Sequence, residues 1–192
     1  MKKVLLLLVF FAVFGGLVFA EADLTTFPPG IGSGPLMNIG VGFGNNWGYK
    51  IRVPPIVFAL DFPFRAINDL PFTLGIGAGF AMHTWDYGYS YYYSNSKYTR
   101  MSFAINGRFA YHFNVGVENL DLYPFIALGA RLWLEKYDYN SSSVKNRSDF
   151  YGRFDFGIGA GIRYYFTNSI GVFGEFGYTG LTWASAGLAI KF

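Results

Sequence analysis

The chain contains no cysteine among its 192 residues. This absence excludes disulfide bonds, thiolate metal sites and a cysteine nucleophile. It also excludes attachment through an acylated cysteine behind a secretion signal. If the protein is anchored in a membrane, the anchor has to be the fold itself.

Charged residues are scarce as well. They make up 14% of the chain, whereas ordinary globular domains have about 25%. Hydrophobic residues reach 52% and aromatic residues 21%. Beyond the N-terminal segment, however, no stretch approaches the ~18 consecutive apolar residues that indicate a spanning helix. An apolar chain without spanning helices can satisfy its backbone in lipid by closing a β-barrel.

The first 20 residues have the pattern of a secretory signal. Two lysines precede a short apolar run, and the segment ends in small residues at Ala20. We expect cleavage after Ala20, with Ala22 as the second choice; an uncleaved anchor is the alternative, but the run is short for a helix of about 20 residues. Removal of residues 1–20 lowers the net charge from +3 to +1, because both lysines leave. The basicity is therefore a targeting feature and indicates no nucleic-acid partner.

The remaining chain divides into two parts. Residues 21–35 are rich in proline, glycine and threonine and are interpreted as a flexible periplasmic leader. Residues 36–192 alternate between apolar residues and small or polar residues with period 2, which is the signal of β-strands. The predicted strands are 37–43, 56–64, 72–84, 98–113, 123–135, 150–166, 170–178 and 184–192.

The connections between these strands alternate in length. The connectors 65–70, 114–120 and 167–169 are short, whereas three others are longer and either polar or rich in tyrosine. Short periplasmic turns and longer outside loops are typical of outer-membrane barrels with an even number of strands. The sequence therefore predicts an all-β fold, a closed antiparallel eight-stranded transmembrane β-barrel with up-and-down topology. The longer predicted outside loops are 44–54, 85–97 and 137–149.

A soluble barrel with its apolar face inward is the alternative. The second face of the strands consists mostly of glycine and alanine with a few charges, which is too sparse for a solvated exterior. Small residues suit the interior of a narrow barrel, where space for side chains is limited. Aromatic residues also gather near both ends of the strands, as they do at lipid interfaces. We therefore expect the apolar face to contact outer-membrane lipid.

The C-terminal tail, GVFGEFGYTGLTWASAGLAIKF (171–192), ends on Phe192 with Ile190 and Leu188 at alternating positions before it. This tail resembles the last hairpin of the small outer-membrane barrel family, which includes the OmpA transmembrane domain, OmpX, OmpW and opacity-type proteins. The resemblance implies a place in the cell outer membrane. It also implies that the tail is read by the barrel assembly machinery, and that periplasmic chaperones are partners during biogenesis.

The inward positions carry the main polar constellation of the chain. Buried charges require partners of opposite sign, because an unpaired one costs several kcal/mol. The first interpretation is a salt-bridge network that fills and seals the lumen, and the alternative is a charged constriction that selects permeating solutes. The residues are Asp61, Arg100, Arg108, Arg131, Glu135, Arg153, Asp155, Arg163, Glu175 and Lys191.

Enzymatic, metal and cofactor sites find little support. The two histidines, His83 and His112, lie in no serine-bearing motif and show no metal-ligand spacing with carboxylates. The glycine-rich runs 75–79 and 157–161 precede no helix, so they fail the test for a dinucleotide site. We expect no catalytic, metal or cofactor residues.

The segment 86–98, DYGYSYYYSNSKY, is dense in tyrosine, which suits recognition surfaces. These side chains could equally form cross-strand pairs above the membrane. Two functions stay open: a structural or adhesin-like barrel whose outside loops bind an extracellular ligand, and a narrow OmpW-like channel for small or apolar solutes. The recognition candidates are Tyr89, Tyr91, Tyr92 and Tyr93.

Overall fold

The computed structural model describes residues 23–44, 50–64, 70–87, 96–139 and 145–192. The predicted signal peptide lies outside these residues. Within them, no helix has both the length and the apolar character needed to cross a membrane.

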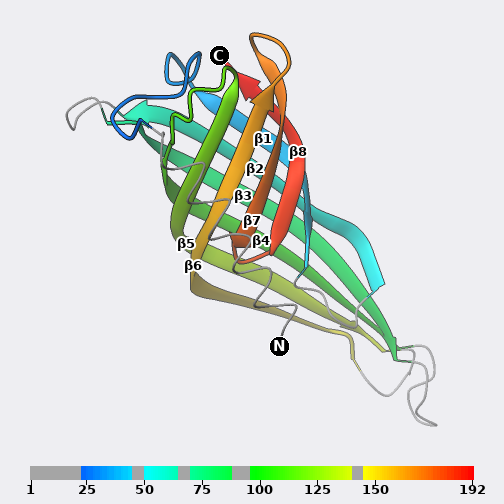
Figure 1. Cartoon of the computed structure of the whole chain (residues 1–192). Coiled ribbons are helices and arrows are strands. Elements are labelled where there is room, and N and C mark those ends of the chain that lie inside the picture. The colour runs from blue at the N-terminus through cyan, green and yellow to red at the C-terminus, as the bar shows by residue number, and fades with distance from the viewer. Residues whose placement is uncertain (1–22, 45–49, 65–69, 88–95, 140–144) are drawn as a thin grey trace, which may run out of the picture.

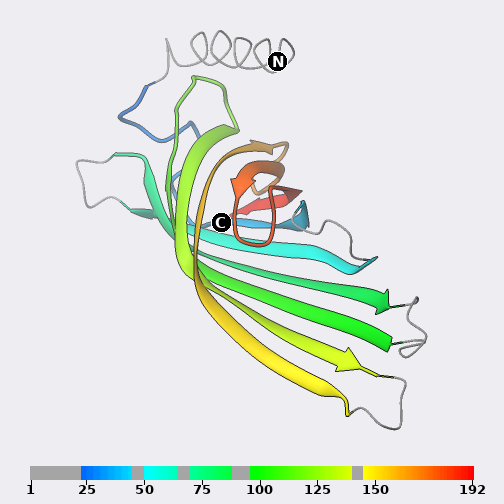
Figure 2. The ribbon, with the colours of Figure 1, turned by 90° about the horizontal axis from the view of Figure 1, so that it is seen from below.

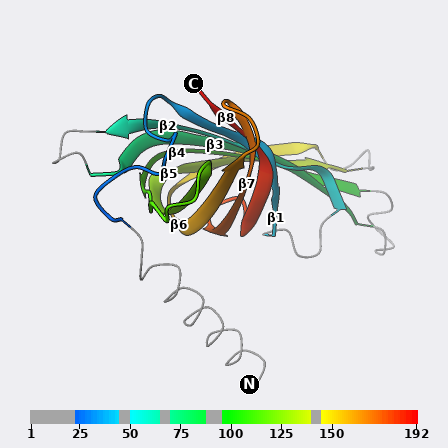
Figure 3. The same cartoon turned by 45° about the horizontal axis from the view of Figure 1, so that its top comes forward.

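The described chain forms eight strands in one sheet (Figure 1). Each strand pairs antiparallel with the next, and β1 pairs with β8, so the sheet closes into a ring (Figure 3). The predicted closed antiparallel barrel of eight strands is confirmed. The strands are β1 Leu36–Phe43, β2 Lys50–Phe64, β3 Phe72–Tyr87, β4 Ser96–Tyr111, β5 Leu120–Asp138, β6 Arg147–Tyr165, β7 Ile170–Tyr178 and β8 Ala184–Lys191.

The strands differ greatly in length. β2 to β6 have 15 to 19 residues, whereas β1, β7 and β8 have 8 or 9. The long strands therefore continue as a fan beyond the closed ring (Figure 2). Parts of the predicted outside loops are strand instead, namely 50–54, 85–87, 96–97, 137–138 and 147–149. In the fan neither face is uniformly apolar, so the period-2 pattern fades while the pairing continues.

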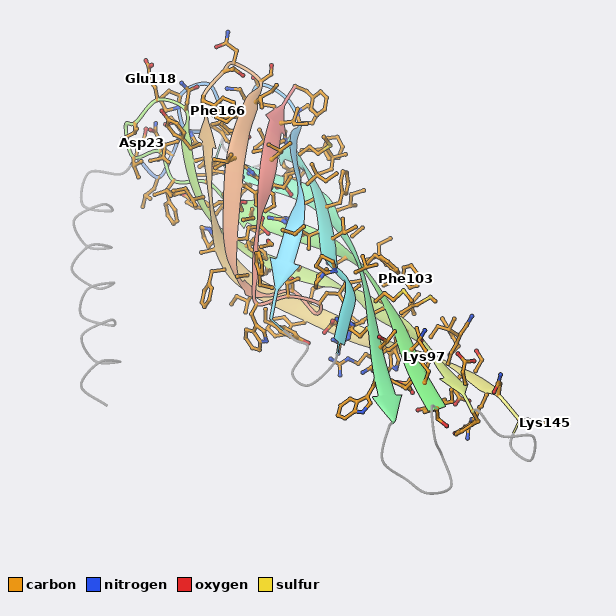
Figure 4. All side chains as sticks on the ribbon, turned by 90° about the vertical axis from the view of Figure 1, so that its right-hand side faces the viewer. Asp23, Lys97, Phe103, Glu118, Lys145 and Phe166 are labelled. Atoms are coloured by element: carbon orange, nitrogen blue, oxygen red, sulfur yellow. The ribbon has the colours of Figure 1, made fainter. Side chains whose placement is uncertain are left out.

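The two faces of the strands separate as the alternation predicts. Ile76, Ile105 and Ile158 point outward and are more than half exposed. Inward positions hold small or polar residues, and some must be glycine: a Cβ at Gly161 would overlap the ring of Tyr123. The turns with Glu118 and Phe166 lie at one end of the barrel, while Lys97 and Lys145 mark the far end of the fan (Figure 4). The C-terminus lies at the turn end (Figure 1).

Candidate functional site

The interior near the turn end holds a buried cluster of charges centred on Arg163 of β6. Its guanidinium Nη1 lies 2.9 Å from Asp121 Oδ2, and its Nη2 forms an ion pair with Asp61. Its Nε donates to Asn38 Oδ1 at 2.8 Å, and the guanidinium carbon lies 4.1 Å from the centre of the Tyr123 ring. All three ionised side chains are fully buried.

Arg108 of β4 extends this cluster across the lumen. Its Nε lies 3.0 Å from Asp61 Oδ1, and its Nη2 donates to Glu175 Oε1 at 2.9 Å. The same Glu175 oxygen accepts from Tyr123 OH at 2.8 Å and from Asn38 Nδ2 at 3.1 Å. Asp61 therefore bridges two guanidinium groups, and six strands, β1, β2, β4, β5, β6 and β7, are joined through charge-assisted hydrogen bonds.

His112 belongs to the same cluster, although the sequence did not indicate it. Its Nδ1 lies 2.7 Å from Asp121 Oδ1, and its Nε2 lies 3.0 Å from Thr73 Oγ1. No carboxylate was predicted beside His112, because the predicted strand began at residue 123 and left Asp121 in the turn. Asp121 lies two residues before Tyr123 and shares its inward face, so a predicted strand that began two residues earlier would have included it.

This hydroxyl–imidazole–carboxylate order matches the arrangement of a hydrolase triad. Thr73, His112 and Asp121 are, however, fully buried, and the ring of Phe27 lies 5.7 Å from that of His112. Asp121 is also shared with Arg163. The arrangement thus satisfies buried polar groups, and Thr73 has no exposed surface to offer a substrate. Among the described residues, no group of three or more acidic, histidine or cysteine side chains could hold a metal ion.

The other predicted charges form a second, more exposed group towards the fan. Arg100 Nε lies 3.5 Å from Glu135 Oε1. Arg131 Nε lies 3.7 Å from Asp155 Oδ2, and Arg153 Nη2 lies 3.9 Å from Asp155 Oδ1. The ten predicted residues are therefore not one network. Lys191 stands apart, with its Nζ 4.8 Å from the centre of the Tyr165 ring.

The segment before β1 covers the turn end of the barrel. Asp23 N donates to Asn114 O at 2.8 Å, and Tyr111 OH donates to Leu24 O. Further along, Pro28 and Ile31 are buried. Ile31 packs in one apolar cluster with Leu36, Tyr165, Phe173 and Ala189, and Phe27 packs against it. Residues 23–35, interpreted from their composition as a flexible leader, thus make specific contacts with the barrel mouth.

The carboxylate of Asp23 is a fixed part of this cover. It accepts hydrogen bonds from Thr26 Oγ1 at 2.6 Å, from Thr25 Oγ1 at 2.7 Å and from Thr25 N at 2.8 Å. These donors, the Thr26 hydroxyl first, lower the pKa of Asp23 to about 2.

The β7–β8 connection closes the ring from the other side. Leu181 and Thr182 turn inward and are buried, and Arg131 Nη1 donates to the carbonyl oxygen of Gly180. Between this hairpin and the buried cluster lies a cavity of about 40 Å³. That volume holds only a few water molecules. Its lining includes Asn38, Asn106, Arg108, Glu175 and Leu181.

The predicted assembly residues lie on the last strand. Leu188 and Ile190 pair with Ile39 and Met37 of β1, and Phe192 N donates to Pro35 O at 3.1 Å. Leu188 and Phe192 are exposed on the outer face. The recognition candidates Tyr89, Tyr91, Tyr92 and Tyr93 lie outside the described residues.

Comparison with known proteins gives structural likenesses only. No family model matches the chain, and no curated protein matches it in sequence. The structure of the attachment invasion locus protein Ail of Yersinia pestis is 14% identical, with a TM-score of 0.43 over 82% of this chain and 92% of Ail. Ail in complex with the heparin analogue sucrose octasulfate is 17% identical, with a TM-score of 0.41 over the same shares. The N-terminal β-barrel domain of Pseudomonas aeruginosa OprF is 14% identical, with a TM-score of 0.40 over 83% of this chain and 98% of that domain.

Proposed function

We propose that the chain is an integral outer-membrane barrel with a sealed lumen, which presents its long strands outside the membrane for surface interactions. Its exterior supports the membrane location. Large apolar side chains surround the closed ring, and many are about half exposed or more, among them Ile76, Ile105, Leu128, Ile158 and Phe176. Soluble monomers rarely expose contiguous apolar patches larger than a few hundred Å².

The observation that carries the sealed lumen is the buried ion-pair cluster between two covers. Arg108 and Arg163 are held by three carboxylates, and Pro28 and Ile31 cover them from the turn end. Leu181 covers the opposite side, and the cavity between holds about 40 Å³. An ion in transit would have to displace buried pairs, and a buried charge without its partner costs several kcal/mol. Eight strands leave an interior just wide enough for side chains.

The unequal strands support the surface role. A barrel that only filled the membrane would need strands of about 9–11 residues, yet β5 and β6 each have 19. The additional length lies in the fan, on the side away from the turns and the C-terminus. If the turns face the periplasm, as in barrels of this class, the fan stands outside the cell.

Conductance of the purified, processed protein in planar lipid bilayers tests the sealed lumen directly. We expect no reproducible current steps from the wild type. Ohmic steps whose amplitude is constant between preparations would reject the sealed lumen and establish the narrow channel instead.

A further inference from the structure

The N-terminal part of β6 pairs with a neighbouring strand on one side only. Residues Arg147–Gly157 pair with β5, but β7 pairs only with Ile158–Tyr165. Among the described strands, none lies on the other side of Arg147–Gly157, and this part of β6 forms the outer edge of the fan (yellow in Figure 2). Phe150 and Phe154 on its outward face are 67% and 73% exposed. An open edge of this length can pair with another strand.

The inner face of this edge carries a charge pattern that is complementary to itself. Arg147, Asp149, Tyr151, Arg153 and Asp155 follow one another at alternate positions. If the strand is turned by 180° about Tyr151 and laid antiparallel against a second copy, Arg147 faces Asp155. Asp149 then faces Arg153. Opposite charges directly across an antiparallel pair stabilise it.

The centre of this arrangement is an aromatic pair. The Tyr151 ring stacks on Trp133 of β5, with the ring centres 5.7 Å apart. Its other side faces the open edge, where Tyr151 of the second copy would pack against it. Cross-strand aromatic pairs stabilise sheets.

The outward face matches in the same register. Phe150 lies opposite Gly152 and Phe154 lies opposite Ser148. Each exposed ring thus faces a small residue over which it can fold, and an aromatic side chain across from an edge glycine is a known stabilising pair.

Neighbouring registers lose this match. A two-fold axis at position 150 places Arg147 opposite Arg153, and an axis at 152 places Asp149 opposite Asp155. An axis at 149 or at 153 places a charged residue opposite itself. Within this range, the register centred on Tyr151 alone pairs all four charges with opposite ones.

We infer that the open edge of β6 binds the same edge of a second copy of this chain, antiparallel and centred on Tyr151. The inference rests on the proposed function, since it requires the fan to stand outside the membrane. The paired segment, 147–155, stops three residues before Ile158, the first residue of β6 that pairs with β7. The second copy therefore occupies the free edge without displacing β7.

Geometry places the second copy in a facing membrane. Two copies in one membrane are related by an axis along the membrane normal, which makes strands tilted by about 35–45° cross at twice that angle. An axis in the membrane plane makes them antiparallel at any tilt. The contact is therefore one between cells, and the partner is the same protein on the opposite surface.

Clustering of phosphatidylcholine vesicles that carry the full processed chain tests this pairing. We expect wild-type vesicles to cluster, as measured by light scattering, and to do so more slowly at high salt because the charges are exposed. Asp149→Arg alone should abolish clustering, because the introduced arginine faces Arg153 of the second copy. Arg153→Asp alone should abolish it for the opposite reason.

A mixture of Asp149→Arg vesicles and Arg153→Asp vesicles should cluster again, because every facing pair is then of opposite sign. This rescue separates specific pairing from a failure to fold. Clustering of both single variants at the wild-type rate, or a mixture that stays dispersed, would overturn the proposal. So would wild-type vesicles that do not cluster.

A cross-link fixes the register independently, because the chain has no other cysteine. Tyr151→Cys should give a disulfide-linked dimer when vesicles cluster, since the residue lies opposite itself. Arg153→Cys should not, because the two cysteines would be offset by four residues, or roughly 14 Å along the strands, beyond disulfide reach. Equal cross-linking at both positions would contradict this register. Conductance is measured separately in single bilayers, so failure of self-pairing leaves the sealed lumen standing, and the reverse also holds.

Discussion

Glu175 on β7 and Arg108 on β4 meet across the barrel interior, with Oε1 and Nη2 2.9 Å apart. Neither strand neighbours the other in the sheet. The contact therefore crosses the lumen. The same carboxylate oxygen also accepts hydrogen bonds from Tyr123 OH and Asn38 Nδ2.

Replacement of Glu175 by glutamine tests this contact. The amide keeps a hydrogen-bonding oxygen but removes the charge, so Arg108 retains only Asp61 as an ionic partner. Removal of one partner from a buried pair costs on the order of 3–5 kcal/mol, and we expect a loss of about this size in the free energy of unfolding in urea. The variant should also be leakier to small ions than the wild type, because water can enter beside the unpaired guanidinium. Glu118→Gln, on an exposed turn, is the matched control and should change neither quantity.

Ile76→Arg tests the outer face. Ile76 is the fifth of the 16 residues of β3, near the middle of a membrane span of about 9–11 residues counted from the turn end, and its outward side chain is 53% exposed. A cation at the midplane of a barrel's lipid face costs about 2–4 kcal/mol, so the free energy of unfolding in lipid vesicles should fall by that amount. Val117→Arg, on an exposed turn, should cost little in the same assay. Equal stability of the Ile76 variant and the wild type would mean that this face does not contact lipid.

The hydrogen bonds that hold residues 23–26 over the turn end of the barrel depend on pH. Hydrogen bonds from Thr26 and Thr25 lower the pKa of Asp23 to about 2, from an ordinary value of 3.8. A lowered pKa means that the contacts stabilise the ionised form, so their contribution is complete above about pH 4 and is lost as the pH falls towards 2. Titration of the Asp23 carboxyl carbon by NMR should give a midpoint near 2 in the wild type. Thr26→Ala should raise the midpoint, whereas Leu24→Ala should leave it unchanged. A wild-type midpoint near the ordinary value would show that residues 23–26 do not hold this turn in solution.

The sequence predicted the closed ring well because, within the ring, apolar residues on the outward face alternate with small or polar residues on the inward face. The predicted segments 170–178 and 37–43 match β7 and β1 to within one residue. The prediction stopped short where the strands leave the ring, since near Arg147 and Asp149 polar residues occur on both faces of β6 and the alternation is lost. Strand pairing continues there because backbone hydrogen bonds need no apolar face.

The charges inside the barrel were predicted, but not their partners. Because successive side chains of a strand point to opposite faces, the alternation places Arg108, Arg163 and Glu175 inward. Which of them meet depends on how far the register shifts around the closed ring, and alternation alone does not contain this shift. Asn38 of β1 reaches Arg163 of β6 for this reason, at 2.8 Å and across a separation of 125 residues.

The last strand gives a prediction about assembly that separates recognition from packing. Phe192 lies just beyond β8, is 66% exposed and donates one backbone hydrogen bond to the oxygen of Pro35, the residue before β1. Its side chain therefore contributes little to the closed ring, so Phe192→Asp should leave the urea midpoint of refolded protein near that of the wild type. If the tail is read by the assembly machinery, as its resemblance to the small outer-membrane barrels implies, the same variant should lower the amount of folded protein in outer membranes. Heat-modifiable mobility on gels measures that amount, and Phe166→Asp, also an exposed aromatic at the turn end, is the control. Equal loss in both variants would assign the effect to the membrane interface and not to a signal in the tail.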